Sequence, residues 1–276
     1  MLHEAGDKVA IYDYSDLAEY TFGVWGTITF DYAVILGGFG SQLAYVIVVG
    51  ETLSVLLTTW GCDSPWCGNS AISILVTIFL LAPLCLLRHF GHFAIASVFS
   101  VGVVVAVMFL VLIGGPIDRV HGEPVRILDW HGTLRSLGSI IFTLSFSVAN
   151  FQAFLTTEKV HQNARSWNSI TGIVVLVGAT MCLAMGLTGY LSFREETKGE
   201  ILDNFSGNIF DVFKLAIICH FILYIPTNII IVRYSVVKVS FGGMQSENLS
   251  WTAHLLLTLF ILALTTGTGI TLVCVS

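Results

Sequence analysis

The chain has 276 residues, of which 55% are hydrophobic and 11% are charged, and its mean hydropathy is +0.85. Soluble domains carry about 25% charged residues, so this composition predicts an integral membrane protein. The formal net charge is −6, with twelve Lys and Arg against eighteen Asp and Glu, which excludes a basic surface for nucleic acid.

The start of the chain does not look like a secretory signal. The run "MLHEAGDKVAIYDYSDLAEY" is polar and acidic and lacks a basic start followed by an apolar core. The first membrane span must therefore act as the membrane signal. Crossing a bilayer core takes about 20 apolar residues. The stretches that meet this requirement lie at about 28–57, 70–88, 92–114, 134–157, 168–192, 209–236 and 251–275.

The first span combines small residues with two acids. The run "GGFGS" at 37–41 lets a neighbouring helix approach closely, so we interpret it as a packing surface. Asp31 and Glu51 lie toward the two ends of the span. An acid inside the membrane points to a function, whereas an acid at the membrane surface is simply solvated, and the sequence leaves both readings open.

The loop after the first span contains two cysteines in the run "GCDSPWCG". Cys62 and Cys67 form either an external disulfide or two free thiols, depending on the side that the loop faces. The other four cysteines lie in apolar spans, where we expect small packing residues. No Cys or His cluster has the spacing of a metal site, so we expect neither a metal nor a cofactor.

The span at 134–157 contains an unusual polar run, "FTLSFSVANFQAF" at 142–154. Its polar residues do not share one face of a helix, because steps of two residues turn about 200°. One interpretation is a helix interrupted near Ser147 and Asn150, whose backbone lines a water-filled cavity. The alternative is that the hydroxyls bond to their own helix and Asn150 links two helices.

The span at 209–236 contains Pro226, which removes one backbone donor and leaves a carbonyl of the preceding turn free. Free carbonyls beside a hydroxyl or an amide are ligands that Na⁺ accepts. This favours an ion site near Ile222, Tyr224 and Thr227, with Asn228 close by. Transmembrane prolines are also common as simple kinks, so that reading stays open.

The distribution of basic residues suggests an orientation. If residues 1–27 are cytosolic, the glycosylation motif "NFS" at Asn204 and the loop of Cys62 and Cys67 both face outside. A second motif, "NLS" at Asn248, then faces the cytosol. The basic residues that this orientation places in or beside cytosolic loops are Arg88, Lys159, Arg165, Arg233 and Lys238.

Six stretches follow one another along the chain: "YSDLAEYTFGVWG" (14–26), "YVIVVGETLS" (45–54), "APLCLLRHFGHFAIASVFSV" (82–101), "FTLSFSVANFQAFLTTEKV" (142–160), "TGYLSFREETKGEILDNF" (188–205) and "PTNIIIVR" (226–233). In this order they resemble the amino acid/auxin permease superfamily, and within it the sodium-coupled neutral amino acid transporters. Each motif is weak alone, but the six together cover nearly the whole chain.

The resemblance implies an all-α polytopic membrane protein with an inverted-repeat, LeuT-like fold, in which residues 1–276 form one transporter domain. Of the family's eleven helices, this chain then begins after the second and ends within the ninth. Residues 142–154 match the sixth helix, which is interrupted in this fold. The resemblance therefore assigns substrate binding to Thr143, Ser145, Phe146, Ser147 and Asn150.

Three departures from the family pattern affect this expectation. A His-Pro pair that often follows the matched residues is replaced by Ala149 and Asn150, which affects substrate choice. The family's first helix, which supplies much of the substrate and ion sites, has no counterpart here. The family's eighth helix places hydroxyls just before its proline, where this chain has Ile222 and Tyr224, so proton coupling or facilitated transport is an alternative to sodium coupling.

We therefore predict a multi-pass transporter, and not an enzyme, that carries neutral amino acids by symport with Na⁺ or H⁺. Its partners are the amino acid and the lipid bilayer, and its location is the plasma membrane or a lysosomal or vacuolar membrane. The main alternative is a truncated relative that transports nothing and acts as an amino acid sensor or regulator. A seven-helix receptor is a weaker alternative, because its sequence motifs are absent.

Overall fold

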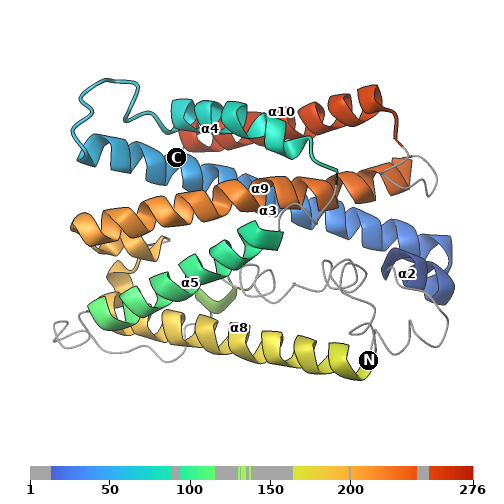
Figure 1. Ribbon diagram of the computed structural model, residues 1–276, viewed down its shortest axis with the longest axis horizontal. Helices are drawn as coiled ribbons and strands as arrows, with labels where there is room; N and C mark the ends of the chain where they lie inside the picture. Colours follow the sequence, from blue (N-terminus) through green and yellow to red (C-terminus); the bar gives the residue numbers. More distant parts are fainter. Residues whose placement is uncertain are drawn as a thin grey trace. The chain divides into compact units, whose positions relative to one another are not determined.

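A computed structural model describes residues 14–88, 94–115, 164–198, 200–240 and 249–275, with isolated residues between 130 and 137. Within these ranges the chain is helical and contains no strand (Figure 1). The helices long and apolar enough to cross a membrane cover Val24–Thr59, Ser97–Gly114, Ser166–Phe193, Asn208–Ser240 and Trp251–Val275. The predicted all-α polytopic membrane class is confirmed.

Two of the predicted spans need comment. The stretch predicted at 70–88 forms α4 (Ser70–Cys85), which has 16 residues and is shorter than the prediction. Nearly all of the span predicted at 134–157 lies outside the described residues.

The chain divides into two compact units, which are described separately. Unit 1 contains Met1–Phe30 and Met108–Asn204, and unit 2 contains Asp31–Val107 and Phe205–Ser276. The helices α3 (Val24–Thr59) and α5 (Ala94–Gly114) each pass from one unit into the other.

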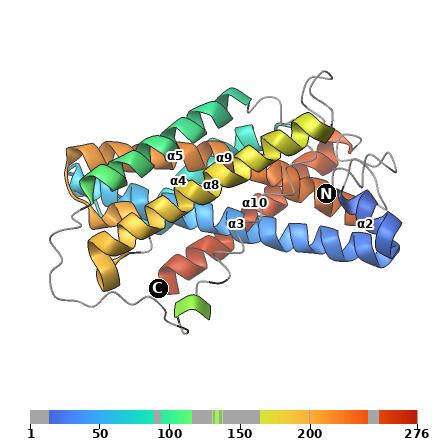
Figure 2. The ribbon, with the colours of Figure 1, turned by 90° about the horizontal axis from the view of Figure 1, so that it is seen from below.

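Unit 1 contains α2 (Tyr14–Phe22), the first turns of α3 and the long helix α8 (Ala164–Phe193), seen along its length in Figure 2. Gly23 joins α2 to α3 with a φ of 67°, a left-handed conformation that suits glycine. Two short 3₁₀ helices, η3 (Arg194–Glu196) and η4 (Ile201–Asn204), follow α8.

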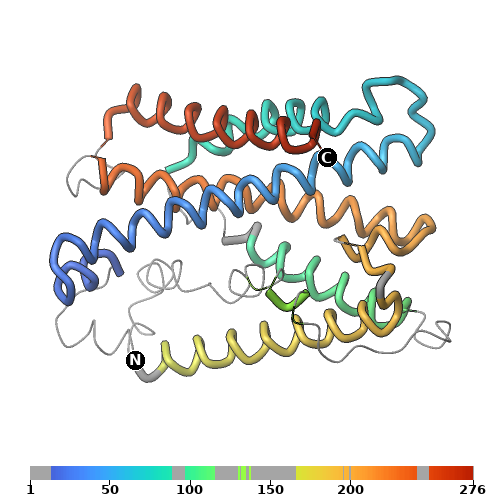
Figure 3. Tube along the Cα trace, turned by 180° about the vertical axis from the view of Figure 1, so that it is seen from behind, coloured from blue at the N-terminus to red at the C-terminus, as the bar shows by residue number. Residues whose placement is uncertain are grey.

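Unit 2 packs four helices around an apolar core: α3 from Asp31 onward, α4, α9 (Asn208–Ser240) and α10 (Trp251–Val275). The helix α4 lies against α10 and α9, and Figures 1 and 3 show α4 and α10 side by side from opposite directions. The buried core residues include Val46, Ile74, Ile78, Leu81, Ile225, Ile229, Ile261 and Leu262.

The contacts fix the direction of α3 and α9. Leu56 near the end of α3 packs with Ile218 near the start of α9, while Gly38 near the start of α3 meets Val232 near the end of α9. The two helices are therefore antiparallel. The loop at 60–69 and the start of α9 lie at the same end of unit 2.

Local chemistry explains where α3 ends and α4 begins. Gly61, with a φ of 88°, ends α3, and the Cys62 amide donates to the Leu57 carbonyl at 3.1 Å, as in a Schellman motif. The Asn69 side chain then accepts from the amides of Ala71 and Ile72 at 3.0 and 3.4 Å, which caps α4.

Candidate functional site

The residues predicted to bind substrate, Thr143, Ser145, Phe146, Ser147 and Asn150, lie outside the described residues. Their assignment stays a prediction.

The predicted ion-binding segment lies in α9, which continues as a helix through Pro226. Proline has no N–H, so the Ile222 carbonyl receives no helical bond from that position. The Thr227 hydroxyl lies 3.4 Å from the Leu223 carbonyl, which is a long bond. The segment therefore offers one carbonyl oxygen and one weakly bonded hydroxyl within two turns, and ion binding there stays a prediction.

The ring of Tyr224 belongs to an aromatic cluster. The Tyr45 ring of α3 lies 6.0 Å from Tyr224 in an edge-on arrangement and stacks on Phe221 at 5.2 Å. The His220 ring lies 5.3 Å from Tyr224. Ile222 packs its side chain against the apolar core, so only its backbone can serve as an ion ligand.

Asn228 forms a polar link between α9 and α3. Its amide nitrogen donates to the Gly38 carbonyl at 2.8 Å, to the Ser41 hydroxyl at 3.1 Å and to the Gln42 side-chain oxygen at 3.3 Å. Gln42 is 1% exposed, and its Nε2 has no partner. The amide of Asn228 is therefore used to join the two helices, beside Gly38, where α3 and α9 approach closely.

The two acids of α3 have different surroundings. Asp31 is 1% exposed, whereas Glu51 is exposed. The solvated reading of the sequence therefore does not apply to Asp31, which lies inside the protein.

A cluster at one end of unit 2 contains buried residues that the sequence did not mark as a site. Arg233 is 1% exposed and donates to the carbonyls of Cys85 and Leu87, at 3.2 and 2.8 Å, and to the Thr258 hydroxyl at 3.0 Å. The distribution of basic residues places Arg233 in or beside a cytosolic loop, whereas the structure places it, buried, inside α9. A charged residue within an apolar span was the signal that could have revealed it.

Side chains from two other positions complete this cluster. The His254 ring lies with Nε2 3.0 Å from the Leu86 carbonyl, and the buried Nδ1 has no partner. Arg88 donates to the Leu249 carbonyl at 3.3 Å, and its guanidinium lies 5.5 Å from the centre of the Trp251 ring. The end of α4 is thus bound by side chains of α9 and α10.

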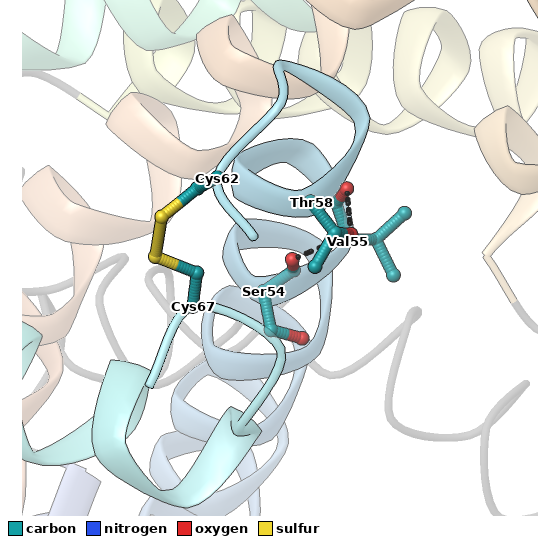
Figure 4. Close-up of a disulfide and its surroundings, with 5 residues drawn as sticks. All are labelled: Ser54, Val55, Thr58, Cys62 and Cys67. Atoms are coloured by element: carbon teal, nitrogen blue, oxygen red, sulfur yellow. Dashed lines mark hydrogen bonds between the residues drawn. A yellow bond between two sulfur atoms is a disulfide. The ribbon is translucent and has the colours of Figure 1, made fainter. Parts of the chain in front are cut away.

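The loop beyond α3 is closed by a disulfide between Cys62 and Cys67 (Figure 4). The nearby Thr58 hydroxyl donates to the carbonyls of Ser54 and Val55, at 3.1 and 2.8 Å, so it is satisfied within its own helix. The sequence left open a disulfide or two free thiols at Cys62 and Cys67, and the structure has the disulfide.

Asn204, in the predicted glycosylation motif, holds the loop that follows α8 through hydrogen bonds of its side chain. Its amide nitrogen donates to the Glu196 carbonyl at 2.8 Å, and its side-chain oxygen accepts from the Lys198 amide at 2.9 Å. Ser206 of the same motif is exposed. Glycosylation of Asn204 stays a prediction.

An apolar groove of about 570 Å³ lies between α4 and α10. Its lining offers no charged partner to the carboxylate or ammonium group of an amino acid, so it is not a candidate substrate site. The lining residues are Leu75, Val76, Ile78, Phe79, Leu80, Ala82, Leu259, Leu262, Ala263 and Thr266.

The apolar helices and their buried polar links define an α-helical multi-pass membrane protein. Over residues 2–273 the chain matches the model of the family described as transmembrane amino acid transporter protein, and it belongs to that family. The resemblance read from the six sequence stretches is confirmed. The family and the relatives are transporters and not enzymes, as predicted.

Three relatives illustrate the match. Amino acid transporter AVT6E of Arabidopsis thaliana is 23% identical, with 91% of this chain and 56% of the relative covered. Vacuolar amino acid transporter 2 of Saccharomyces cerevisiae is 24% identical, with 70% and 42% covered. A Homo sapiens protein provisionally named sodium-coupled neutral amino acid transporter 11 is 23% identical, with 95% and 65% covered.

The chain therefore spans about half the length of the curated relatives it matches. No solved structure matches the chain.

Proposed function

We propose that this protein transports amino acids across a membrane by secondary active symport. The observation that carries the proposal is the family match over residues 2–273. The relatives named above include amino acid transporters from a plant, a yeast and an animal, which supports an amino acid as the substrate class.

We further propose that the substrate is a neutral amino acid. A zwitterion needs donors at its carboxylate and acceptors at its ammonium group. Ser145, Ser147 and Asn150 offer both without net charge. The human relative also carries the words neutral amino acid in its name.

The coupling ion is Na⁺ or H⁺. The name of the human relative supports Na⁺, whereas the vacuolar name of the yeast relative gives no ion. In α9 the Ile222 carbonyl and the Thr227 hydroxyl are the groups that we propose as ligands, and Tyr224 borders them. The membrane is the plasma membrane or a lysosomal or vacuolar membrane. The name of the yeast relative supports a vacuolar membrane, whereas the name of the human relative gives no membrane.

The test is uptake of labelled neutral amino acids by the full-length protein in proteoliposomes, with Na⁺ gradients and pH gradients applied separately. We expect Ser145→Leu and Asn150→Leu to abolish uptake while leaving membrane insertion intact. Thr180→Leu is the matched control, because Thr180 is exposed and its hydroxyl donates to its own helix at Leu176.

Normal uptake by the two variants would remove the proposed substrate site. If the intact protein bound an amino acid but transported none under either gradient, the transport proposal would fail and a sensing role would replace it.

A further inference from the structure

Arg233 and its partners form what we call the Arg233 clamp: the Arg233 guanidinium, the Thr258 hydroxyl and the carbonyls of Cys85 and Leu87. All of them belong to unit 2. The partners come from α4, α10 and the two residues that follow α4, so one side chain of α9 joins three segments. Together with the His254 contact to Leu86, three successive carbonyls are bound from outside their own helix.

The hydrogen-bond partners of Arg233 in the described part of the chain are neutral. Among the described residues no carboxylate binds this guanidinium, and its Nε is buried without a partner. The carbonyl end of a helix carries partial negative charge, which compensates a cation in part. Breaking these bonds releases neutral carbonyls but leaves the buried guanidinium without partners, so this end opens only if water reaches Arg233 at the same time.

The end of α4 is also weakened from within. Pro83 lies one turn before the bound carbonyls and has no N–H, so the Phe79 carbonyl loses its helical partner. The last turn of α4 therefore depends more than an ordinary helix end on the side chains of α9 and α10. A weakened turn that is held by side chains of neighbouring helices is a suitable hinge.

We propose that Arg233 is a positioning residue for transport: it holds the last turn of α4 closed against α9 and α10, and this contact is released and remade in each transport cycle. The second part of the inference rests on the proposed transport function. The first part concerns the fold alone and can be tested without uptake.

Cys85 is a built-in reporter for the clamp. Its side chain is 0% exposed and its carbonyl binds Arg233, so a maleimide reaches the thiol only when this end of the unit opens. The experiment uses the full-length protein in proteoliposomes with the other reduced cysteines replaced by alanine. Within these 276 residues they are Cys182, Cys219 and Cys274.

We expect Arg233→Gln to speed the labelling of Cys85 by about tenfold or more, because bonds to a charged donor are lost. Arg233→Lys keeps the charge with fewer donors and should give an intermediate rate. Lys238→Gln is the matched control, since it removes a positive charge from the same helix outside the clamp. Thr258→Val removes one acceptor of Arg233 and is the second test variant, to be used if Arg233→Gln does not insert into the membrane.

Uptake and labelling together decide the proposal. We expect Arg233→Gln to lower the maximal uptake rate about tenfold with KM nearly unchanged, since closure and not substrate binding is affected. Substrate should change the Cys85 labelling rate in the parent but not in Arg233→Gln.

Equal labelling rates in the parent and in the Arg233 and Thr258 variants would overturn the clamp. Faster labelling with unchanged uptake, or with no effect of substrate on the parent, would overturn its role in the cycle. If the parent protein itself transports nothing, the proposed function fails, and the labelling ratio still decides whether Arg233 closes this end.

Discussion

Single residues set how closely the helices of unit 2 approach. A side chain added at Gly50 would overlap Ile74 of α4, and one added at Gly38 would overlap Val232 of α9. Gly37 and Gly40, on the same helix, face open space. The sequence indicated a packing role for the small residues at 37–41, but it could not separate the glycines that touch a neighbour from those that do not.

We expect Gly50→Ala to lower the free energy of unfolding by about 1–3 kcal/mol, because the added methyl group overpacks the contact between α3 and α4. Gly40→Ala is the control, and we expect it to be neutral or stabilising by up to about 1 kcal/mol through helix propensity. Thermal unfolding in detergent, followed by size-exclusion chromatography, measures both. Equal melting temperatures would contradict the close contact.

The bond from Asn228 to Ser41 allows a measurement of how much one polar link between membrane helices contributes to the free energy of unfolding. We expect a double-mutant cycle of Asn228→Ala and Ser41→Ala to give a coupling energy of about 0.6 kcal/mol, the average for such bonds. Chemical unfolding of the four proteins measures this energy. A coupling energy of zero would show that the amide does not bind Ser41, and a change in the ion dependence of uptake would add Asn228 to the proposed ion ligands.

The burial of Arg233 on backbone carbonyls could not be predicted from the sequence. Arg233 lies seven residues before the end of α9, so its position alone suggested the membrane surface. Only the packing of α4 and α10 shows that the guanidinium is buried on backbone carbonyls. Contacts between segments some 148 residues apart leave no pattern in the sequence.

At the scale of helices, apolar length predicted the elements well and their ends less well. The prediction of 251–275 coincides with α10, whereas 209–236 became Asn208–Ser240. A hydropathy pattern reads the part of a helix inside the bilayer, but the helix continues into water where its polar ends are satisfied. In α4 the reverse holds, because Pro83 and the clamp end the helix before the apolar run ends.

The threonines of α10 show why polar residues did not break the predicted spans. Thr258, Thr265 and Thr268 each donate to the carbonyl four residues earlier, at 2.7 to 2.9 Å. A hydroxyl bonded to its own helix adds little cost in an apolar environment. Hydroxyl residues in a span are therefore weak evidence for a site unless the helix is interrupted.

At the scale of the whole molecule, the direction of the helices bears on orientation. The loop of Cys62 and Cys67 lies at the same end of unit 2 as Phe205, which follows Asn204 directly. The other end carries Arg88 and Lys238, and the buried acid Asp31 lies at the same end. The excess of basic residues favours that end as the cytosolic one.

We expect Asn204 and the Cys62–Cys67 loop to be accessible from the same, non-cytosolic side. The test uses sealed vesicles whose outer face is the non-cytosolic face of the membrane. After reduction of the disulfide, an impermeant maleimide should label Cys62 and Cys67. Asn204→Gln should remove any glycan that is seen as a mass shift. The control is Asn248→Gln, which should leave the mass unchanged. Labelling only after permeabilisation would reverse the assigned orientation.

The family was predictable from the sequence because six motifs kept their order along the chain. The inverted repeat remains a prediction, since the resemblance and not the described helices carries it. The candidate substrate site rests on the polar run at 142–154, which the structure does not describe.

The shortness of α4 has a consequence for the surrounding lipid. Its 16 residues span about 24 Å, whereas the hydrocarbon core of a bilayer is about 30 Å thick and the 33 residues of α9 span about 50 Å. The mismatch of α4 is relieved by thinning of the bilayer beside this short helix. We therefore expect the protein to be more stable in membranes of short acyl chains than in thicker ones.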